Sequence, residues 1–491
     1  MGGGYPGTAL RDRELARVSA AGLLMLALVA VVMIATGLPA FIVLIGVAAL
    51  FAVVGIAMGT LPYELLTALP WRVLGLLESD LLQALPLYVL MGALLNRLPL
   101  ADTLFRAGNA LFARTPAAPL LSALGLGALL APMNGSVGAG VATLSRVVHP
   151  RLVARGVPGE QSLAMVCVAS TLGVVVPPSL VLILLGDAML GAHTQAVTQT
   201  GRLERVINTQ DVFRGALVPA ALFLLLAFGW AWWTGRRARP AGSERGGRRG
   251  WLAAGTTLAL ILGLLSAVTA GYLYAVEAAA AGAVALFAAG LATRALTLPV
   301  LMLVLRNTMA VTGALFALFI AATTFTLVFR AFESDRVLEA LIQAIPGGGA
   351  GAVAAVLLVL GLCAFVLDAF EIILVIIPLL MPALLAREPD AVWVAVLTLL
   401  ALQASFLIPP FGYAVMMARS ATAEAGSLRR LAAALLPFLG LQLLVLGLTL
   451  AWPRLAHLAE PATAAARALP PAEIERQLEI VVPAPEPEDE R

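Results

Sequence analysis

Apolar stretches about 20 residues long recur along the chain, and this pattern constrains the fold more than any other feature. As a helix, a stretch of about 20 apolar residues covers the roughly 30 Å of hydrocarbon in a bilayer. The stretches lie at 18–36, 38–58, 81–98, 212–234, 251–270, 272–293, 306–329 and 431–452. Only 12% of all residues are charged, about half the fraction usual in soluble domains. The sequence therefore predicts an all-α polytopic membrane protein.

Charged and metal-binding residue types exclude several classes of protein. The 31 residues counted as Lys or Arg are all arginine, so the chain lacks the lysine of Walker-type ATPases and of Schiff-base enzymes. His149, His193 and His457 form no zinc or calcium motif. We therefore expect no metal cofactor, no catalytic residue and no enzymatic activity. Cys167 and Cys363 lie in apolar segments and are interpreted as small buried hydrophobes rather than as a disulfide.

The distribution of arginine predicts which loops face the cytoplasm, because cytoplasmic loops are enriched in basic residues. If the N-terminus lies outside, 17 arginines fall inside: Arg97, Arg106, Arg114, Arg146, Arg151, Arg155, Arg236, Arg237, Arg239, Arg245, Arg248, Arg249, Arg294, Arg306, Arg419, Arg429 and Arg430. Residues 235–250 are interpreted as an Arg-rich cytoplasmic loop, with a lipid head-group site as the alternative. We expect residues 1–17 to precede a retained first span and residues 453–491 to form a polar, flexible tail.

Two long apolar regions are interrupted by proline pairs. The region 161–190 contains Pro177-Pro178, and the region 391–420 contains Pro409-Pro410. Proline has no backbone N–H and disfavours helix at the residue before it. We therefore predict two broken helices.

Two other regions have an apolar half on each side of a polar turn. They cover residues 118–148 and 351–386, and each is too short to cross a bilayer twice. Non-helical backbone at membrane depth is tolerated only where it lines a cavity or is buried in protein. Re-entrant helical hairpins fit both regions best.

The two halves of the chain share this layout. The two hairpin turns lie at Asn134 and Asp368, and the two proline pairs begin at Pro177 and Pro409. The interval between the turns is nearly the same as the interval between the proline pairs. Because the first half, 18–234, crosses the membrane an odd number of times, the second, 251–452, is expected to be inverted. Inverted repeats with matching interruptions are typical of secondary transporters that bind their cargo near the bilayer midplane.

The first hairpin turn reads NGSVGAG at residues 134–140. Unpaired peptide groups are costly in hydrocarbon, so such a turn is expected to line a cavity or to bind a ligand. Asn134 and Ser136 offer oxygen ligands, and Pro177-Pro178 leaves backbone carbonyls unpaired in the first broken helix. A dehydrated sodium ion suits these donors. The alternative is that the glycines only permit close helix packing.

An ordered set of motifs covers most of the chain. The motifs are LPLYVLMGALLNR (85–97), NGSVGAGVATLS (134–145), STLGVVVPPSLVLILLGDAM (170–189), DVFRGALVPA (211–220), FVLDAFEIILVIIPLLMP (365–382) and QASFLIPPFGYAVMMAR (403–419). Together they resemble the large membrane subunit of tripartite ATP-independent periplasmic (TRAP) transporters, the DctM-like family. LGD, LDAFEI and SFLIPPFG resemble its mannitol or chloroaromatic (2-oxo acid) branch.

The resemblance implies a sodium-coupled, elevator-type importer in the bacterial inner membrane. It implies two protein partners: a small four-helix membrane subunit and a periplasmic substrate-binding protein. The expected cargo is a small organic anion, a carboxylate such as a 2-oxo or 2-hydroxy acid. Sodium is the coupling ion, and no other cofactor is implied. A stand-alone ion-coupled carrier of organic anions that needs no binding protein is the alternative.

The resemblance also assigns candidate site residues. The first sodium site falls on Asn134, Ser136, Gly173, Val176 and Pro178. The second is expected around Asp368, Ser405, Ile408 and Phe411. Candidate solute contacts are Thr171, Asp187, Glu371 and Arg419.

Two of these positions leave alternatives open. Family members often have threonine where this chain has Ile408, which offers no side-chain oxygen. A second cation then needs backbone carbonyls, Ser405 or Asp368, unless Asp368 carries a proton that replaces one sodium ion.

Asp368 and Glu371 lie three residues apart, so a helix would place both on one face. Arg419 either holds a solute carboxylate or anchors the helix end at the cytoplasmic surface.

Overall fold

The computed structural model describes residues 6–78, 80–134, 136–177, 179–202, 205–236, 248–422 and 426–460. Within these residues every regular element is a helix, which confirms the all-α class. The first half forms α1 (Pro6–Thr36), α2 (Ala40–Ala57), η1 (Tyr63–Thr67), α3 (Ala68–Leu77), α4 (Asp80–Arg97), α5 (Leu100–Leu111), α6 (Ala118–Leu130), η2 (Pro132–Asn134), α7 (Val137–Val147), α8 (His149–Ala154), α9 (Gly159–Val175), α10 (Leu180–Thr200) and α11 (Thr209–Gly235).

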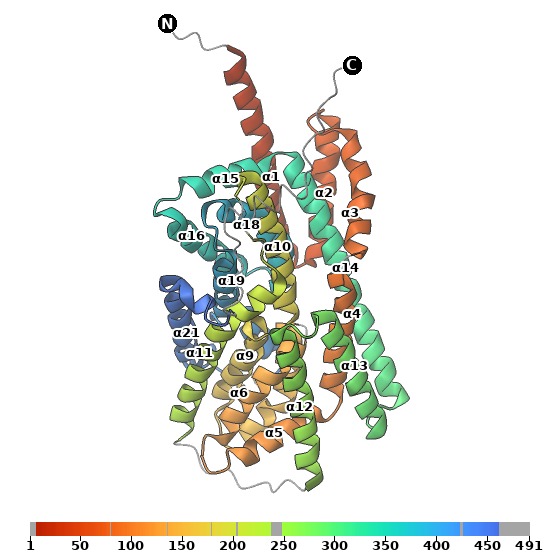
Figure 1. Cartoon of the computed structure of the whole chain (residues 1–491), viewed down its shortest axis with the longest axis vertical. Helices are drawn as coiled ribbons and strands as arrows, with labels where there is room; N and C mark the ends of the chain where they lie inside the picture. The colour runs from red at the N-terminus through yellow and green to blue at the C-terminus, as the bar shows by residue number, and fades with distance from the viewer. Residues whose placement is uncertain are drawn as a thin grey trace, which may run out of the picture.

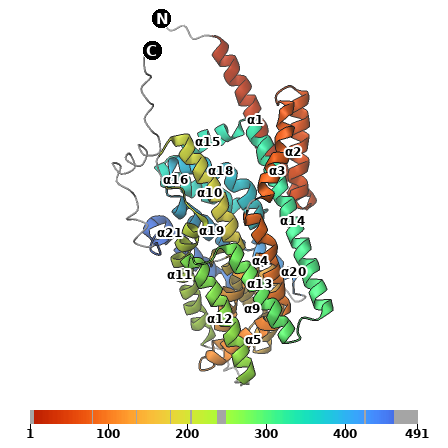
Figure 2. The same ribbon diagram turned by 45° about the vertical axis from the view of Figure 1, so that its right-hand side comes forward.

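The second half has a similar order of elements. It forms α12 (Arg248–Ala270), α13 (Ala275–Ala292), α14 (Leu298–Ala331), α15 (Ser334–Ala344), α16 (Gly348–Cys363), α17 (Ala369–Glu371), the π-helical η3 (Ile372–Ile376), α18 (Ile377–Arg387), α19 (Ala391–Phe406), α20 (Tyr413–Ser420), α21 (Leu428–Ala451) and η4 (Pro453–Ala456). In Figures 1 and 2, α14 runs along one side of the molecule and α11 and α21 lie on the other.

The eight apolar stretches predicted as ordinary spans all lie in helices, namely α1, α2, α4, α11, α12, α13, α14 and α21. Judged by length and composition, 8 helical segments of the described chain could cross a membrane, or 9 if the bent pair Tyr63–Leu77 and Leu82–Arg97 counts as one span. The eight are not the same set as the predicted spans: they include Gly159–Thr200 and Ala369–Arg387, whereas the apolar part of α1, Ala21–Thr36, is shorter than the others. Two helices are longer than their predicted stretches by ten residues or more. Helix α1 begins at Pro6, inside the segment 1–17, and α14 extends beyond both ends of 306–329.

Both proline pairs break a helix, as predicted. Helix α9 ends at Val175, and α10 begins only at Leu180. The backbone of Val176, between them, is extended, with φ −84° and ψ 116°. Helix α19 likewise ends at Phe406, and α20 begins at Tyr413. In each case the carbonyl four residues before a proline lacks its helical hydrogen bond, because proline has no N–H to donate.

Both predicted hairpins are helix–turn–helix units. The first consists of α6, η2 and α7, and the second of α16, α17, η3 and α18. The second hairpin begins at Gly348 and ends at Arg387, close to the predicted limits of 351–386. We call these two units hairpin 1 and hairpin 2.

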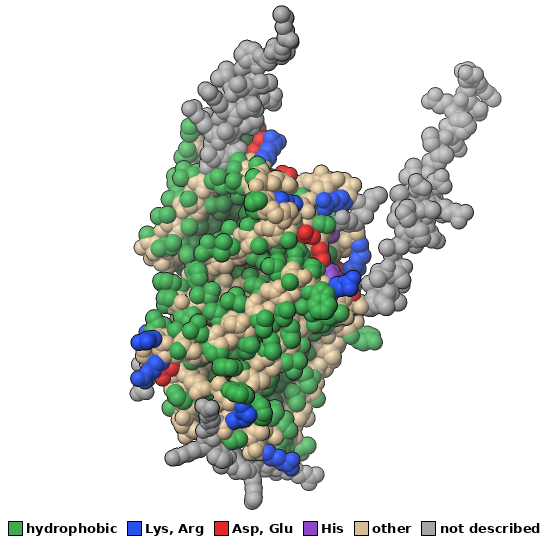
Figure 3. Space-filling view, turned by 90° about the vertical axis from the view of Figure 1, so that its left-hand side faces the viewer, with side chains coloured by type: hydrophobic (Ala, Val, Ile, Leu, Met, Phe, Trp, Pro, Cys, Tyr) green, Lys and Arg blue, Asp and Glu red, His purple; other side chains and the backbone are tan. Residues whose placement is uncertain are grey.

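Helices α9 and α19 form the centre of the molecule. All residues of α9 from Ser162 to Val175 are buried, and so are all residues of α19. Figure 3 shows a face on which hydrophobic side chains cover the middle, while charged side chains lie toward its upper and lower parts. The two helices that the prolines interrupt are therefore also the most completely enclosed.

Some predictions concern residues outside the described part of the chain. These are Pro178, the side chain of Asn134, most of the Arg-rich loop (237–247) and most of the tail (461–491).

Candidate functional site

Hairpin 1 packs tightly against the end of α9. A Cβ atom added to Gly173 would lie 2.5 Å from the carbonyl oxygen of Ala131, at the hairpin turn. A Cβ on Gly127, one turn earlier in α6, would lie 2.6 Å from the carbonyl oxygen of Ala169. Such approaches need glycine, because any side chain would push the two backbones apart. Glycine thus holds the turn of hairpin 1 beside the first helix break.

Ser136 and Gly173 place oxygen atoms where the turn of hairpin 1 meets the first helix break. Ser136 is the N-cap of α7, and its Oγ accepts a hydrogen bond from Ala139 N–H at 3.2 Å. The N–H of Val176 donates to Leu172 O at 2.9 Å, which closes the last turn of α9. The Gly173 carbonyl has no such partner, because residue 177 is proline. Its oxygen is therefore available to a ligand.

Hairpin 2 carries two carboxylates at its turn. The Oδ1 of Asp368 accepts from Ala369 N–H at 2.7 Å, and Glu371 Oε2 accepts from Asp368 N–H at 3.0 Å. This reciprocal arrangement is a capping box that starts α17. The residue spacing predicted a shared helix face, but Asp368 lies just ahead of the helix, as its cap.

The second helix break lies beside hairpin 2. The Phe411 ring meets the Phe365 ring edge-on, with centroids 6.4 Å apart. Ser405 is buried against hairpin 2, where a Cβ on Gly361 would lie 3.2 Å from Ser405 Oγ. Ile408 is half-buried, and its carbonyl accepts from Gly412 N–H at 2.7 Å. A cation at Ile408 would have to share that oxygen.

Tyr413 links the second helix break to hairpin 1, and sequence reasoning missed it. Its hydroxyl lies beside the start of α7, where a Cβ on Gly138 would be 3.0 Å away. Helix α20, which begins at this tyrosine, packs against both α7 of hairpin 1 and α9 of the first broken helix. The tyrosine follows the second break directly, in FGY. The two hairpins and the two breaks thus meet in one central region, which we call the junction.

The candidate solute contacts come from four different helices. Thr171 is fully buried within α9, and its hydroxyl donates to Val168 O at 3.0 Å. Asp187 lies on an exposed face of α10. Arg419 is half-buried in the last turn of α20. Glu371 alone among them belongs to a hairpin turn.

Two polar contacts join the hairpins to the long helices outside the junction. Thr143, in hairpin 1, donates its hydroxyl to Asn96 Oδ1 at 2.6 Å, and Arg146 donates to Asn96 O at 2.9 Å. Arg330, at the end of α14, donates to Pro378 O at 3.1 Å in hairpin 2, and also to Gln195 Oε1 at 2.9 Å. These contacts connect residues far apart in the sequence, and no sequence pattern indicated them.

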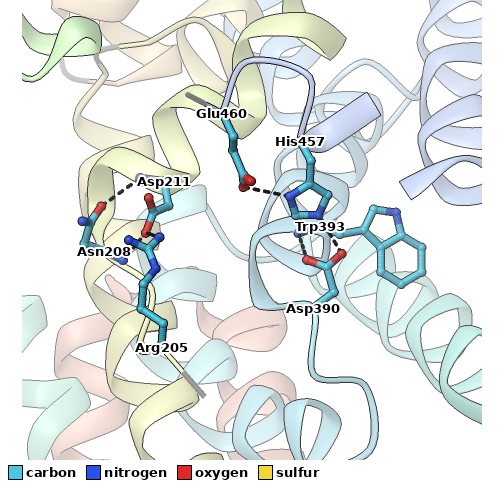
Figure 4. Close-up of polar contacts among 7 residues, drawn as sticks. All are labelled: Arg205, Asn208, Asp211, Asp390, Trp393, His457 and Glu460. Carbon is cyan, nitrogen blue, oxygen red and sulfur yellow. Dashed lines mark hydrogen bonds and ion pairs between the residues drawn. The ribbon is translucent and has the colours of Figure 1, made fainter. Parts of the chain in front are cut away.

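A further polar cluster lies outside the membrane-spanning helices. His457 Nδ1 lies 2.8 Å from Glu460 Oε1, and its Nε2 lies 2.8 Å from Asp390 Oδ2. Asp390 also caps α19 by accepting from Trp393 N–H at 3.0 Å. We call the contacts of His457 with Asp390 and Glu460 the C-terminal clasp. Figure 4 shows it together with the ion pair of Arg205 and Asp211 at the start of α11. Hydrogen bonding to Asp390, and then to Glu460, raises the pKa of His457 to about 9.

The C-terminal clasp predicts a loss of stability at alkaline pH. Folding raises the pKa of His457 from 6.5 to about 9. The protonated imidazole therefore adds its full contribution to the free energy of unfolding below pH 6.5, and this contribution disappears as the pH rises through about 9. For partly exposed charges we expect at most about 1 kcal/mol. Thermal unfolding at graded pH tests this, and His457→Gln should remove the alkaline loss. Equal losses in wild type and variant would contradict the assignment.

Comparison with known proteins gives consistent matches. Residues 27–455 match the family model "Tripartite ATP-independent periplasmic transporter, DctM component". The C4-dicarboxylate TRAP transporter large permease protein DctM of Rhodobacter capsulatus is 27% identical over 248 residues, which are 48% of this chain and 53% of that protein. The isethionate TRAP transporter permease protein DctMQ of Oleidesulfovibrio alaskensis is 24% identical over 425 residues, 82% of this chain and 61% of that protein. The chain therefore spans less than two thirds of the length of either relative.

Two further matches cover more of the compared protein. A putative TRAP transporter large permease protein of Haemophilus influenzae is 23% identical over 389 residues, which are 76% of this chain and 90% of that protein. The crystal structure of the Alcanivorax borkumensis YdaH transporter superposes with a TM-score of 0.55 at 17% identity, covering 81% of this chain and 90% of that one. The latter shows a shared fold only. With the apolar helices, the matches indicate a multi-pass membrane protein whose relatives are permeases.

Proposed function

Because the chain belongs to the DctM family of TRAP transporter components, we propose that it is the large permease subunit of a sodium-coupled importer in a bacterial inner membrane. The importer takes up a small organic anion and works with a small four-helix membrane subunit and a periplasmic substrate-binding protein. Relatives named for C4-dicarboxylates and for isethionate support a small organic anion as cargo. A 2-oxo or 2-hydroxy acid fits this class.

One observation carries this proposal: the two hairpin turns meet the two helix breaks at the junction. Gly173 brings the first break against hairpin 1, and Phe411 brings the second against hairpin 2. Interrupted helices expose carbonyls and helix ends that can coordinate a cation in a membrane interior. An arrangement that served only packing would not need these unpaired backbone groups.

We assign two sodium sites to the junction. The first uses Asn134, Ser136, Gly173, Val176 and Pro178, and the second uses Asp368, Ser405, Ile408 and Phe411. The Gly173 carbonyl and the Ser136 hydroxyl support the first site. At the second, Asp368 supplies a charged oxygen that compensates for the missing hydroxyl at Ile408. Sodium binding is favoured by such hard oxygen donors.

The two halves of the chain are proposed to be inverted repeats. The pairs α5 and α15, α9 and α19, and α10 and α20 begin at matching places in the two halves, separated by nearly the same length of chain. Each half therefore supplies one hairpin, one broken helix and one long neighbouring helix. In an elevator, the hairpins and broken helices move as one unit against the remaining helices, and the Asn96 and Arg330 contacts lie on that boundary.

The boundary predicts a conformational effect of Thr143→Val. The substitution keeps the shape but removes the 2.6 Å hydrogen bond to Asn96. We expect the substitution to destabilise the arrangement seen here by about 1 kcal/mol relative to the other transport state. The ratio of the two populations should then change by about fivefold. Single-molecule energy transfer between dyes on α4 and α7 measures that population. Thr308→Val is the matched control, because Thr308 bonds only within α14. Equal populations in the two variants would contradict the proposed boundary.

The proposed function is tested by uptake into proteoliposomes that contain the chain with its small membrane subunit. Uptake of a radiolabelled organic acid should require an inward sodium gradient and the purified periplasmic binding protein. Sodium-dependent uptake without the binding protein would instead identify a stand-alone carrier. Uptake that is equal in sodium and in potassium would contradict coupling to sodium.

A further inference from the structure

An apolar cavity of about 400 Å³ lies between the first helical pair and hairpin 2. Its walls come from α1 and α2 on one side and from α16, η3 and α18 on the other, with contributions from α14 and α15. Leu26, Leu44, Phe325 and Leu379 are among the lining residues. The cavity borders the turn of hairpin 2 without belonging to either proposed sodium site.

The lining has one polar member. Every lining residue except Glu371 is apolar, and the lining contains no basic residue. One oxygen of Glu371 is already bonded to the N–H of Asp368. A ligand that fills this space must therefore present hydrocarbon to nearly all of the wall. An anionic group would meet the Glu371 carboxylate and no cation to balance it.

The rim of the cavity opens on an apolar surface. Val359 and Leu362, on α16, are 45% and 56% exposed, and Val366 is 41% exposed. Ala30 faces them from α1 and is exposed as well. Helix α2, which also lines the cavity, is apolar and long enough to cross a bilayer. The rim therefore lies on a surface that hydrocarbon chains of the bilayer cover.

We propose that one hydrocarbon chain of a bilayer phospholipid occupies this cavity, between the α1–α2 pair and hairpin 2. An empty cavity would deprive its walls of dispersion contacts, whereas an acyl chain restores them. The head group stays outside the rim, because the cavity offers an anion only the like charge of Glu371. Fluid hydrocarbon rather than fixed side-chain packing then separates hairpin 2 from α1 and α2.

Photocrosslinking tests the site on the whole chain. The protein is reconstituted in nanodiscs that contain a phosphatidylcholine with a diazirine in the middle of one acyl chain, and adducts are mapped by mass spectrometry. We expect adducts on Leu379, which lines the cavity and is only 4% exposed. Adducts confined to outward-facing residues such as Leu362 would overturn the proposal.

A cavity-filling variant sharpens the test. The ring in Ala30→Phe occupies the space and should lower the yield of Leu379 adducts by about fivefold or more. Ala281→Phe is the matched control, because Ala281 is exposed on α13 and does not line the cavity. If Ala30→Phe does not fold, Val359→Phe fills the cavity from its other side. Unchanged adducts in a folded cavity-filling variant would refute the site.

A soluble occupant is distinguished by competition. Saturating succinate or hexanoate, added with sodium, should leave the Leu379 adducts unchanged if a lipid chain occupies the cavity. Loss of the adducts in either acid would show that the cavity holds solute, and the acyl-chain proposal would be wrong. This outcome is independent of the proposed function, because uptake is not measured.

Discussion

Gly173→Ala is expected to reduce sodium-driven uptake by about tenfold or more, because the added Cβ would lie 2.5 Å from the carbonyl oxygen of Ala131. Alanine favours helix more than glycine does, so helix propensity alone would make this change stabilising. The loss must therefore come from separating the turn of hairpin 1 from the first helix break. Uptake per folded transporter is the quantity to measure, with folding checked by size-exclusion chromatography and thermal unfolding.

Gly191→Ala is the matched control for Gly173→Ala. Gly191 lies on α10, in the same broken helix, and a Cβ there would meet nothing within 4 Å. This variant should keep wild-type uptake. The account of the first site would be wrong if a folded Gly173→Ala transporter worked as well as Gly191→Ala. Equal loss in both variants would point to a general sensitivity of the broken helix.

Asp368→Asn is expected to raise the sodium concentration for half-maximal uptake by about tenfold, which corresponds to about 1.4 kcal/mol. Asparagine caps a helix about as well as aspartate, so α17 should still begin at the same place. What the variant removes is the negative charge next to the second proposed cation. Initial uptake rates across a sodium series give the shift.

Ile408→Thr and pH separate the two possible roles of Asp368. If Asp368 is a sodium ligand, Ile408→Thr adds an oxygen and should partly rescue Asp368→Asn. If Asp368 instead carries a proton, wild-type uptake at fixed sodium should fall as the external pH rises. Glu371→Gln is the control for general loss of charge in the capping box. Sodium dependence that neither Asp368→Asn nor pH alters would exclude a special role for this carboxylate.

Local sequence signals were sufficient to predict the interruptions of the fold. Proline lacks an N–H, so each proline pair had to end a helix within a few residues, and α9 and α19 end at Val175 and Phe406. The polar turns inside short apolar regions likewise predicted both hairpins. The length of an apolar stretch was a poorer guide to helix ends, because α1 begins in polar residues and α14 continues through Arg306 and Asn307 into further apolar residues.

Contacts between distant segments could not be predicted from a single sequence. Nothing around Tyr413 indicates that its hydroxyl meets Gly138, which lies in the other half of the chain. The contact of Arg330 with Pro378 depends on how α14 packs on hairpin 2. Gln403 is fully buried in α19, and neither polar atom of its side chain has a partner among the described residues. Such features follow from tertiary packing, which overrides local preference.

Sodium binding to the purified chain tests the central claim most directly, namely that the junction is a sodium site. Thermal unfolding in detergent is followed as sodium replaces potassium at constant ionic strength. Ligand binding to the folded state alone raises stability with the logarithm of ligand concentration. We predict a saturable stabilisation by sodium over potassium that is weaker in Ser136→Ala, weaker in Asp368→Asn and absent in the double variant. Equal stabilisation by both ions, or a sodium effect that survives in the double variant, would contradict the claim.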